Sequence, residues 1–506
     1  MNRDIKNIGI IGAGIMGTGI VQIAIQSQHH VYLYDAQQGA AQKAQSKLQD
    51  TFNTLLQKNK ISQAQLDEAL AYLHIVENIE GLQQCDLIIE AIVEKLAVKQ
   101  ALMKQLEAIV DPQTILASNT SSLSITAIAS ECQYPERVAG YHFFNPVPLM
   151  KVVEVIQGLH THPEILEKLA DLAQKMGHRP VHTKDTPGFI INHAGRAYGT
   201  EALKILSENT ASISEIDEIL KTSLGFKMGP FELLDLTGLD VSHPVMESIY
   251  TQYYQEPRYR PNVLTQQMLT GKKLGRKTGQ GFYRYLNQKK QEITSTPRYV
   301  ANRNGIKRVW LHTEFKDDFE RLSQYLSQQY ILINHEAKPT ANDLVIIASY
   351  GEDATHSALR LGLNPEQVVC IDMLGNFEQS RTLMPSLVTR QKLIEAALHI
   401  FTQAECKTFV IEESLGFITQ RVLAMVVNLA CDMAQQQIAS VEDINEAVKL
   451  GLGYPHGPIE WGDLVGREKI LRILERISSI SHDPRYRPSP WLQRRCKLNL
   501  SLMHHA

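Results

Sequence analysis

Three glycines near the N terminus have the spacing of a phosphate-binding turn. They stand in the run Gly12-Ala13-Gly14-Ile15-Met16-Gly17, which directly follows an apolar strand pattern over 7–11 and opens a helical pattern. This order is typical of dinucleotide binding, because bare backbone and the free N–H groups of a first helical turn can approach a pyrophosphate. We predict that all six residues contact a dinucleotide.

A second apolar run, over 31–34, ends in Asp35. A carboxylate at this position can accept hydrogen bonds from ribose hydroxyls and repels a 2′-phosphate, so it favours NAD over NADP. A glycine pattern alone also occurs in ordinary turns. The two strands and the acid together favour the dinucleotide interpretation.

His142 and Glu154 have the residue types of an acid–base pair. His142 follows a strand predicted over 137–141, and Glu154 interrupts the apolar run 152–156. Oxidation of an alcohol by NAD requires a base for the hydroxyl proton, and imidazole, with an ordinary pKa of about 6.5, is suited to this at neutral pH. A carboxylate inside an apolar run is rarely buried unpaired, and pairing with Glu154 would fix the imidazole tautomer. A single histidine at a strand end is also compatible with a structural role.

Two polar segments are candidates for substrate contact. Ser118-Asn119-Thr120-Ser121-Ser122 follows a strand predicted over 114–117, at the sheet edge where ligands of open α/β folds bind. The same hydroxyls could instead cap a helix. The stretch 40–72 is predicted to be helical and carries several lysines, which form either an ordinary solvated face or an arm that meets a phosphorylated substrate: Lys43, Lys47, Lys58 and Lys60.

The order of the elements predicts the fold that must position these residues. Strand patterns alternate with helical patterns over residues 1–185, at 7–11, 31–34, 73–76, 86–90, 114–117, 137–141 and 151–156. This alternation predicts a Rossmann-type doubly wound parallel sheet. Residues 186–285 have mainly helical patterns, and the polar segment 286–306 is a predicted linker.

The second half of the chain repeats part of the first. Gly188-Phe189-Ile190-Ile191 recurs 228 positions later as Gly416-Phe417-Ile418-Thr419, and two further blocks recur at nearly the same offset. We therefore predict a second copy of the helical domain over 411–500. Residues 307–410 have strand patterns without a glycine fingerprint. They predict a degenerate α/β domain, a decayed copy of the C-terminal part of the first, with scaffolding as its default role.

Composition restricts the class of protein. A net charge of −3 over 506 residues argues against nucleic acid as the main partner. The six cysteines include no C-x-x-C pair, which fits a reducing compartment and gives no sign of a metal site. The start of the chain does not read as a signal peptide, and the longest apolar stretch, 422–430, is too short to span a bilayer. We expect a cytoplasmic protein without membrane partners.

Several longer motifs resemble one family. S-N-T-S-S, Y-H-F-F-N-P, K-V-V-E-V and D-T-P-G-F-I-I-N occur in this order and resemble the L-3-hydroxyacyl-CoA dehydrogenases, over residues 1–285 and again over 410–500. Members of that family use NAD to oxidise the 3-hydroxyl of an acyl-CoA, bound between the NAD domain and the helical domain. The resemblance implies that His142 is the base and Glu154 its partner. It also implies that Ser121, which binds substrate, and Asn192 contact the reacting oxygen and the histidine.

The resemblance extends to further ligand contacts. By position it implies NAD contacts for Glu94, Lys99, Asn145 and Lys277, and contacts with coenzyme A for Thr51 and Lys58. Outside these motifs, the two NAD-site lysines would be interpreted as surface residues. The second helical copy has Gln420 where the first has Asn192, and 307–410 has no evident counterpart of the His142–Glu154 pair. We therefore predict one active site per chain.

The sequence constrains the substrate and the state of assembly less than it constrains the family. The four-part architecture is similar to long family members of phenylacetate catabolism, which implies 3-hydroxyadipyl-CoA and a cation for its carboxylate; His193, where the family usually has arginine, and Arg196 are candidates. A 3-hydroxybutyryl-CoA dehydrogenase, a free hydroxy-acid dehydrogenase and a non-catalytic NAD-binding protein are the alternatives. Shorter members pair their helical domains across a dimer, so the second copy would make that contact within one chain. Association into homo-oligomers through other surfaces stays open.

Overall fold

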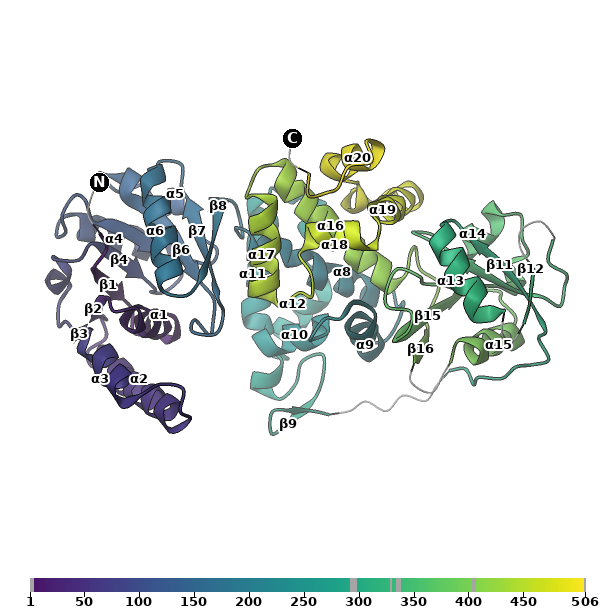
Figure 1. The fold of residues 1–506 in the computed structure, drawn as a ribbon, viewed down its shortest axis with the longest axis horizontal. Helices are drawn as coiled ribbons and strands as arrows, with labels where there is room; N and C mark the ends of the chain where they lie inside the picture. The colour runs from purple at the N-terminus through teal and green to yellow at the C-terminus, as the bar shows by residue number, and fades with distance from the viewer. Residues whose placement is uncertain (1–3, 292–297, 328–329, 334–337, 403–405, 505–506) are drawn as a thin grey trace. The chain divides into compact units, whose positions relative to one another are not determined.

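The computed structural model describes residues 4–291, 298–327, 330–333, 338–402 and 406–504 (Figure 1). Two compact units emerge from its contacts: Met1–His193 with Gln436–Leu452, and Ala194–Gln435 with Gly453–Ala506. In the predicted linker, strands β9 (Tyr285–Leu286) and β10 (Lys289–Lys290) form a short hairpin, and 292–297 lie outside the described residues.

The first unit is built on an eight-stranded sheet in the order β3-β2-β1-β4-β5-β6-β7-β8. Its strands are β1 (Asn7–Ile11), β2 (His30–Tyr34), β3 (Leu73–Ile75), β4 (Leu87–Glu90), β5 (Ile115–Ser118), β6 (Val138–Phe143), β7 (Val152–Gln157) and β8 (Arg179–Lys184). The pairings among β1 to β6 are parallel, which confirms the Rossmann-type prediction.

One edge of the sheet departs from the parallel pattern. β7 runs antiparallel to β6, and β8, which the strand patterns did not predict, runs parallel to β7. Only residues 144–151 connect β6 to β7, and a parallel pair needs a crossover of a dozen or more residues. The predicted end of the sixth strand at residue 141 was wrong. β6 continues to Phe143, so His142 lies inside the strand.

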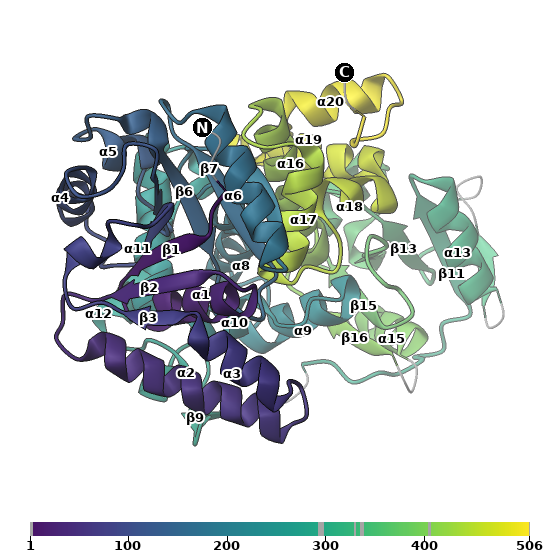
Figure 2. The same cartoon turned by 60° about the vertical axis from the view of Figure 1, so that its left-hand side comes forward.

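Helices cover both faces of this sheet, as a buried parallel sheet requires. α1 (Ile15–Gln26) and α6 (Pro163–Lys175) contribute to the core on one face, and α4 (Leu96–Glu107) and α5 (Ile125–Ala129) to the core on the other. The predicted helical stretch 40–72 forms two helices, α2 (Ala40–Gln57) and α3 (Gln63–Ala71), because Ser62 caps the second. The pair extends from the sheet edge at β3 (Figure 2).

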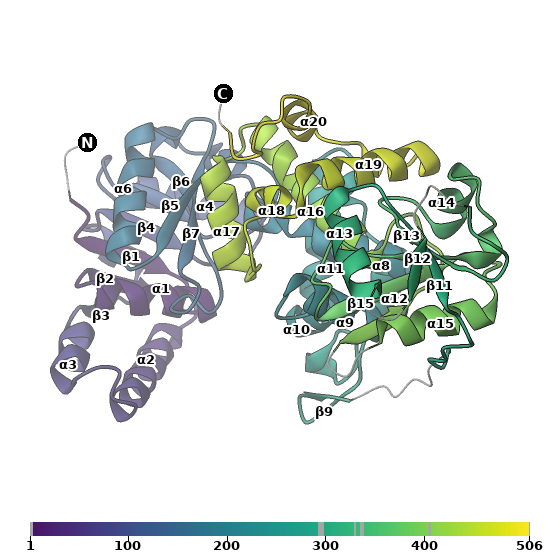
Figure 3. The ribbon, with the colours of Figure 1, turned by 45° about the vertical axis from the view of Figure 1, so that its right-hand side comes forward.

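One helix of this unit comes from far along the chain. α17 (Val441–Leu452) packs against β7 and β8, the two reversed strands (Figure 3). It belongs to the second helical copy, in which it corresponds to α9 (Ile213–Leu224), 228 positions earlier. α9 in turn packs against a strand of the second sheet, β15 (Ser380–Pro385). Each helical copy therefore places this helix on the α/β segment of the other half.

The helices of the second unit confirm the duplication. Its first copy contains α8 (Arg196–Ser207), α9, α10 (Pro230–Thr237), α11 (Leu239–Gln252), the turn η3 (Pro257–Tyr259) and α12 (Val263–Thr270). The second copy contributes α16 (Ile418–Gln435), α18 (Pro458–Val465), α19 (Arg467–Ser481), the turn η6 (Pro484–Tyr486) and α20 (Pro490–Lys497). The longest apolar stretch, 422–430, lies in α16, which is buried from Ile418 to Ala434 and packed along α8.

The second sheet repeats the reversed edge of the first. Its order is β12-β11-β13-β14-β15-β16, with β14 and β15 antiparallel and β15 and β16 parallel. The remaining strands and helices are β11 (Arg308–Thr313), β12 (Ile331–Ile333), β13 (Leu344–Ala348), β14 (Val368–Ile371), β16 (Lys407–Val410), α13 (Lys316–Leu326), α14 (Ala354–Arg360) and α15 (Gln391–Phe401). This topology agrees with a decayed copy of the C-terminal part of the first sheet.

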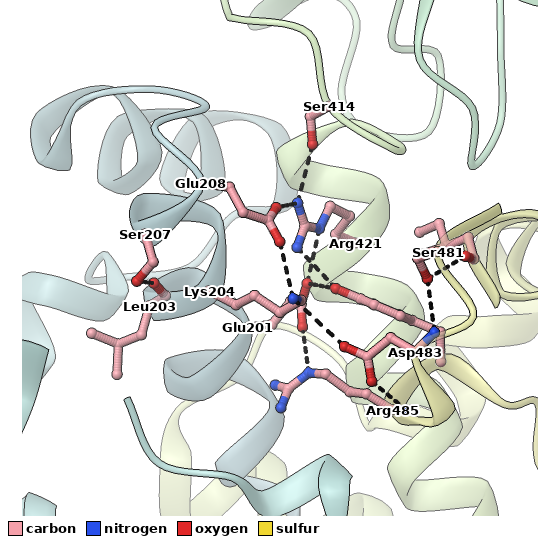
Figure 4. Close-up of polar contacts among 12 residues, drawn as sticks. Glu201, Leu203, Lys204, Ser207, Glu208, Ser414, Arg421, Ser481, Asp483 and Arg485 are labelled. Carbon is pink, nitrogen blue, oxygen red and sulfur yellow. Dashed lines mark hydrogen bonds and ion pairs between the residues drawn. The ribbon is translucent and has the colours of Figure 1, made fainter. Parts of the chain in front are cut away.

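Buried ion pairs join the two helical copies (Figure 4). Glu201 on α8 is 0% exposed and accepts hydrogen bonds from Arg421 Nε at 2.9 Å and Arg485 Nε at 2.8 Å. Tyr486 Oη donates to the same carboxylate at 2.7 Å. Arg421 also pairs with Glu208. One residue of the first copy thus holds two cations of the second.

A cavity of about 210 Å³ opens beside this network. Four of the five charged residues in its lining are already paired: Lys204 lies 3.0 Å from Glu208 and 3.6 Å from Asp483, and Arg485 binds Glu201. The cavity therefore belongs to the contact between the copies. Among the described helices, none combines the length and apolarity that a membrane span needs. The described residues also contain no cluster of ligating side chains suited to a metal ion.

Candidate active site

The glycine turn leaves room for a pyrophosphate where α1 begins. Gly12 has a φ of +105°, and a Cβ there would lie 2.6 Å from the carbonyl oxygen of Ala91. A Cβ on Gly17 would lie 1.8 Å from Gly12 O, whereas one on Gly14 would meet nothing within 4 Å. The first and third glycines are therefore required by close packing. The second borders open space at a helix N-terminus, which fits NAD.

Asp35 is fixed beside this turn at the end of β2. Its Oδ2 accepts the N–H of Ala13 at 2.7 Å, and its Oδ1 accepts the N–H of Gln37 at 2.8 Å. The half-buried carboxylate is thus part of the turn's own hydrogen bonding. It stands where the second strand of a dinucleotide fold presents its acid to the ribose.

The sheet pairs His142 with Glu154 directly. The two residues are opposite one another in the β6–β7 register, and His142 Nδ1 lies 2.6 Å from Glu154 Oε2. His142 is 5% exposed and Glu154 is 0% exposed. Because the carboxylate engages Nδ1, it selects the tautomer in which Nε2 carries the lone pair. Within the described part of the chain, Nε2 has no hydrogen-bond partner.

The other oxygen of Glu154 is held by the chain after β8. Gly188 (φ +80°) and Phe189 (φ +49°) turn the backbone so that the N–H groups of Ile190 and Ile191 both donate to Glu154 Oε1 at 2.9 Å. Two backbone donors compensate for part of the cost of burying a charge and fix the direction of the carboxylate. The orientation of His142 therefore depends on this turn as well as on the sheet.

The hydroxyl-rich segment after β5 forms a turn around Glu94. Glu94 Oε1 accepts the N–H of Ser121 at 3.0 Å and that of Ser122 at 3.1 Å, and the hydroxyl of Thr120 at 2.6 Å. Burial opposes ionisation, but the Thr120 hydrogen bond and the charge of Lys99 outweigh it and hold the pKa of Glu94 below its usual value. The helix-capping alternative was wrong for this segment, because Ser124 caps α5.

Asn192 lies against this turn, since its Nδ2 donates to Ser121 O at 3.3 Å. The structure thus brings Ser121 and Asn192 together. The ends of β1, β4, β5 and β6 lie at one edge of a parallel sheet. The glycine turn, the hydroxyl-rich turn and His142 therefore share the edge at which ligands of such folds bind.

A buried ion pair at this edge was missed. Lys99 is 1% exposed, so its interpretation as a surface lysine was wrong; its Nζ binds both Glu90 oxygens, at 2.8 and 2.9 Å, and lies 3.4 Å from Glu94. Ser118 also donates to Glu90. Burial raises the pKa of Glu90 even though Lys99 opposes the shift. The sequence signal for this ion pair was Glu90, a carboxylate at the end of an apolar strand pattern.

The remaining predicted contacts are not brought to this cluster by any described interaction. Asn145 is exposed after β6, Thr51 is exposed on α2, and Lys58 is exposed directly after that helix. Lys277 belongs to the second unit, where it pairs with Asp240 at 2.6 Å. Their contacts with NAD and coenzyme A stay predictions.

The corresponding positions in the second sheet lack the acid–base pair. Asp372 and Thr382 occupy the places of His142 and Glu154, and Asp372 N donates to Thr382 O at 3.0 Å. Gln420 Nε2 donates to Asp372 Oδ1 at 3.1 Å and to Ser349 O at 2.8 Å, and its Oε1 accepts the N–H of Gly351 at 3.0 Å. Burial raises the pKa of Asp372 to about 6. The side-chain amide of Gln420, which corresponds to Asn192 of the first half, thus binds Asp372 where the first half has its histidine.

A dinucleotide turn beside a histidine with a fixed carboxylate is the arrangement of an NAD-dependent alcohol dehydrogenase. The family model of the 3-hydroxyacyl-CoA dehydrogenase NAD binding domain matches residues 7–186, and that of the C-terminal domain matches 188–285 and 416–501. The chain belongs to the 3-hydroxyacyl-CoA dehydrogenase family. It is an NAD-dependent enzyme of that family.

Individual relatives agree with this assignment. The chain is 35% identical over 498 residues to the 3-hydroxyadipyl-CoA dehydrogenase of Escherichia coli, covering 98% of this chain and 99% of that one. It is 40% identical to the 3-hydroxybutyryl-CoA dehydrogenase of Clostridioides difficile, over 55% of this chain and 99% of that protein. A crystal structure described as 3-hydroxybutyryl-CoA dehydrogenase from Escherichia coli has a TM-score of 0.86 at 35% identity, covering 98% of this chain and 99% of that one.

Proposed function

We propose that the chain oxidises (3S)-3-hydroxyacyl-CoA to 3-oxoacyl-CoA, with His142 as the base. The observation that carries the proposal is the buried 2.6 Å contact between His142 Nδ1 and Glu154. It leaves Nε2 as the proton acceptor at the ligand-binding edge of the sheet. The stereochemistry and the acyl-CoA class come from the family.

His142 Nε2 takes the proton of the C3 hydroxyl while the C3–H bond breaks. When bound, NAD accepts the hydride from C3. Glu154 stabilises the imidazolium that forms, and its two backbone donors keep it aligned as the charge develops. In the reverse direction His142 returns the proton to the forming alkoxide. Ser121 and Asn192, which the Nδ2 hydrogen bond holds together, orient the reacting oxygen.

The ligand contacts in this proposal follow the sequence predictions. NAD is bound by the glycine turn over 12–17 and by Asp35, with Glu94, Lys99, Asn145 and Lys277 as further contacts. Because Lys99 is enclosed by Glu90 and Glu94, it supports NAD mainly by fixing these carboxylates. Thr51 on the exposed side of α2 and Lys58 directly after that helix contact coenzyme A.

For the acyl group we propose 3-hydroxyadipyl-CoA. The support is the full-length similarity to a protein of that name at 35% identity. A distal carboxylate requires a cation. Of the two candidates, His193 is 0% exposed and Arg196 is half-buried, which favours Arg196. Burial lowers the pKa of Arg196 to about 10, so it stays charged at neutral pH.

The test is NADH formation from NAD with 3-hydroxyadipyl-CoA, 3-hydroxybutyryl-CoA and a longer unsubstituted ester. We expect kcat/KM to be about tenfold or more higher for the adipyl ester, as a charge-assisted contact provides. Arg196→Gln should remove this preference and leave the butyryl ester almost unaffected. A preference for the butyryl ester would support a short-chain enzyme. NAD binding without turnover of any ester would support a free-acid or non-catalytic protein.

We also propose that one chain is the catalytic unit, with its second helical copy replacing a dimer contact. The support is the packing of α8 along α16 and the burial of Glu201 between arginines of the other copy. In sedimentation velocity, active enzyme should not require a dimer joined through its first helical copy, and association through other surfaces is compatible with the proposal. An obligate dimer joined through residues 186–285 would contradict the proposal.

A cytoplasmic location completes the proposal. All six cysteines, which lie among the described residues, are free thiols. Structural disulfides form mainly in oxidising compartments, so free thiols support a reducing one.

A further inference from the structure

The segment Gln436–Leu452 of the second helical copy holds the edge strand of the sheet that carries His142 and Glu154. The N–H of His182 on β8 donates to Asp443 Oδ2 at 3.2 Å, and the N–H of Lys184 donates to Ile438 O at 2.9 Å. Edge-strand donors otherwise point into solvent or meet another chain. Here a segment more than 250 positions further along the chain takes them up.

The last turn of α17 approaches the chain that follows β8. A Cβ on Gly451 would lie 2.4 Å from Ile191 Cδ1 and 3.1 Å from Ile191 Cγ1. Ile191 is 1% exposed, so its side chain has little room to move away. Glycine at 451 is therefore what allows the helix backbone to pack directly on Ile191.

Ile191 connects this contact to the acid–base pair. Its N–H is one of the two donors to Glu154 Oε1, and Glu154 Oε2 engages His142. The next residue, Asn192, donates to Ser121 O. A displacement of Ile191 would move both a hydrogen bond to Glu154 and the asparagine beside the substrate hydroxyl.

We propose that Gly451 is a positioning residue of the dehydrogenase, which lets α17 hold Ile191 in the place where its N–H aligns Glu154 with His142. The proposal rests on the proposed function, because it requires that pair to carry out the proton transfer. It assigns the second helical copy a role in catalysis although no residue of that copy enters the described pair.

The most direct test adds a methyl group on one side of the contact and removes one on the other side. Gly451→Ala adds a methyl where Ile191 Cδ1 lies, and Ile191→Val removes Cδ1. Alanine raises helix propensity by about 1 kcal/mol relative to glycine, so a helix effect alone would stabilise the protein. We expect Gly451→Ala to lower kcat about tenfold and to alter the pH–rate profile, with KM for NAD unchanged. The double variant should recover most of the lost kcat.

The matched control is Gly199→Ala. Gly199 also lies within a helix, α8, but a Cβ there would meet nothing within 4 Å, so kcat should not change. Ile191→Val alone, which loosens the contact without adding bulk, should lower kcat by a smaller factor. If Gly451→Ala does not fold, the kcat of Ile191→Val tests the proposal in its place.

Two results would overturn the proposal. The first is a Gly451→Ala variant whose kcat and pH–rate profile equal those of the parent chain. If that variant does not fold, the same result in Ile191→Val would count. The other is a double variant no more active than Gly451→Ala. The proposed function fails separately, through full turnover by a variant that lacks His142, whatever the Gly451 variants show.

Discussion

The variant His142→Gln is expected to lose between about 10²- and 10⁴-fold in kcat while it binds NAD as tightly as the parent chain. Glutamine retains a polar side chain inside β6, but its amide cannot take the hydroxyl proton at neutral pH. The turn that we propose to hold NAD is formed by other strands and by Asp35. The measurement is NADH absorbance in steady state, with NAD affinity followed by quenching of protein fluorescence.

The matched control is His160→Gln, since His160 is exposed and lies outside the cluster. It should leave kcat unchanged. Glu154→Gln should also lower kcat strongly, because the neutral amide no longer selects the imidazole tautomer or stabilises imidazolium. Turnover at the parental rate in His142→Gln, with its mass verified, would exclude His142 as the base.

The second large effect concerns stability. Glu201→Gln should lower the free energy of unfolding by about 3–5 kcal/mol, because it leaves the buried guanidinium groups of Arg421 and Arg485 without the charge between them. Urea denaturation followed by circular dichroism measures the loss. The control is Glu208→Gln. Glu208 also pairs with Arg421, but its side chain is 39% exposed, so the loss should be about 1 kcal/mol or less.

The same carboxylate predicts a pH dependence. Burial alone would raise the pKa of Glu201, but the charges of Arg421 and Arg485 and the hydrogen bond from Tyr486 hold it below its usual value. A carboxyl with a lower pKa in the folded state stabilises the protein above its unfolded pKa, about 4.3, and loses this contribution as the pH falls through the folded value. The difference between parent and Glu201→Gln should therefore narrow below about pH 4. A constant difference down to pH 2 would contradict this.

Local sequence patterns were sufficient to predict the features that backbone geometry itself determines. The glycine turn was predictable because Gly12 needs a positive φ and Gly17 needs close packing, and both are properties of the residue type. The pairing of His142 with Glu154 was predictable for a different reason. A carboxylate in a buried strand must find a partner, and only a few side chains at that sheet edge could provide one.

The same reasoning applied to Glu90 would have predicted a buried cation, and Lys99, nine positions later, provides it. Other features depend on contacts that no local pattern encodes. β8, Arg179-Pro180-Val181-His182-Thr183-Lys184, has few apolar residues and is a strand because β7 and the segment 436–452 take up its backbone groups. The role of Ile191 likewise depends on a helix from the other end of the chain.

Gln420 fills the place in the second half that corresponds to Asn192 at the active site, yet the helices that link the halves remain. α9 still covers β15, and α17 still covers β8. We therefore expect the second half to be retained for its shape, with the chemistry carried by the first. Substitutions at the buried arginine partners of Glu201 should accordingly disturb the second unit. A gene shortened to its first half would encode every group of the acid–base pair but not the support that aligns it.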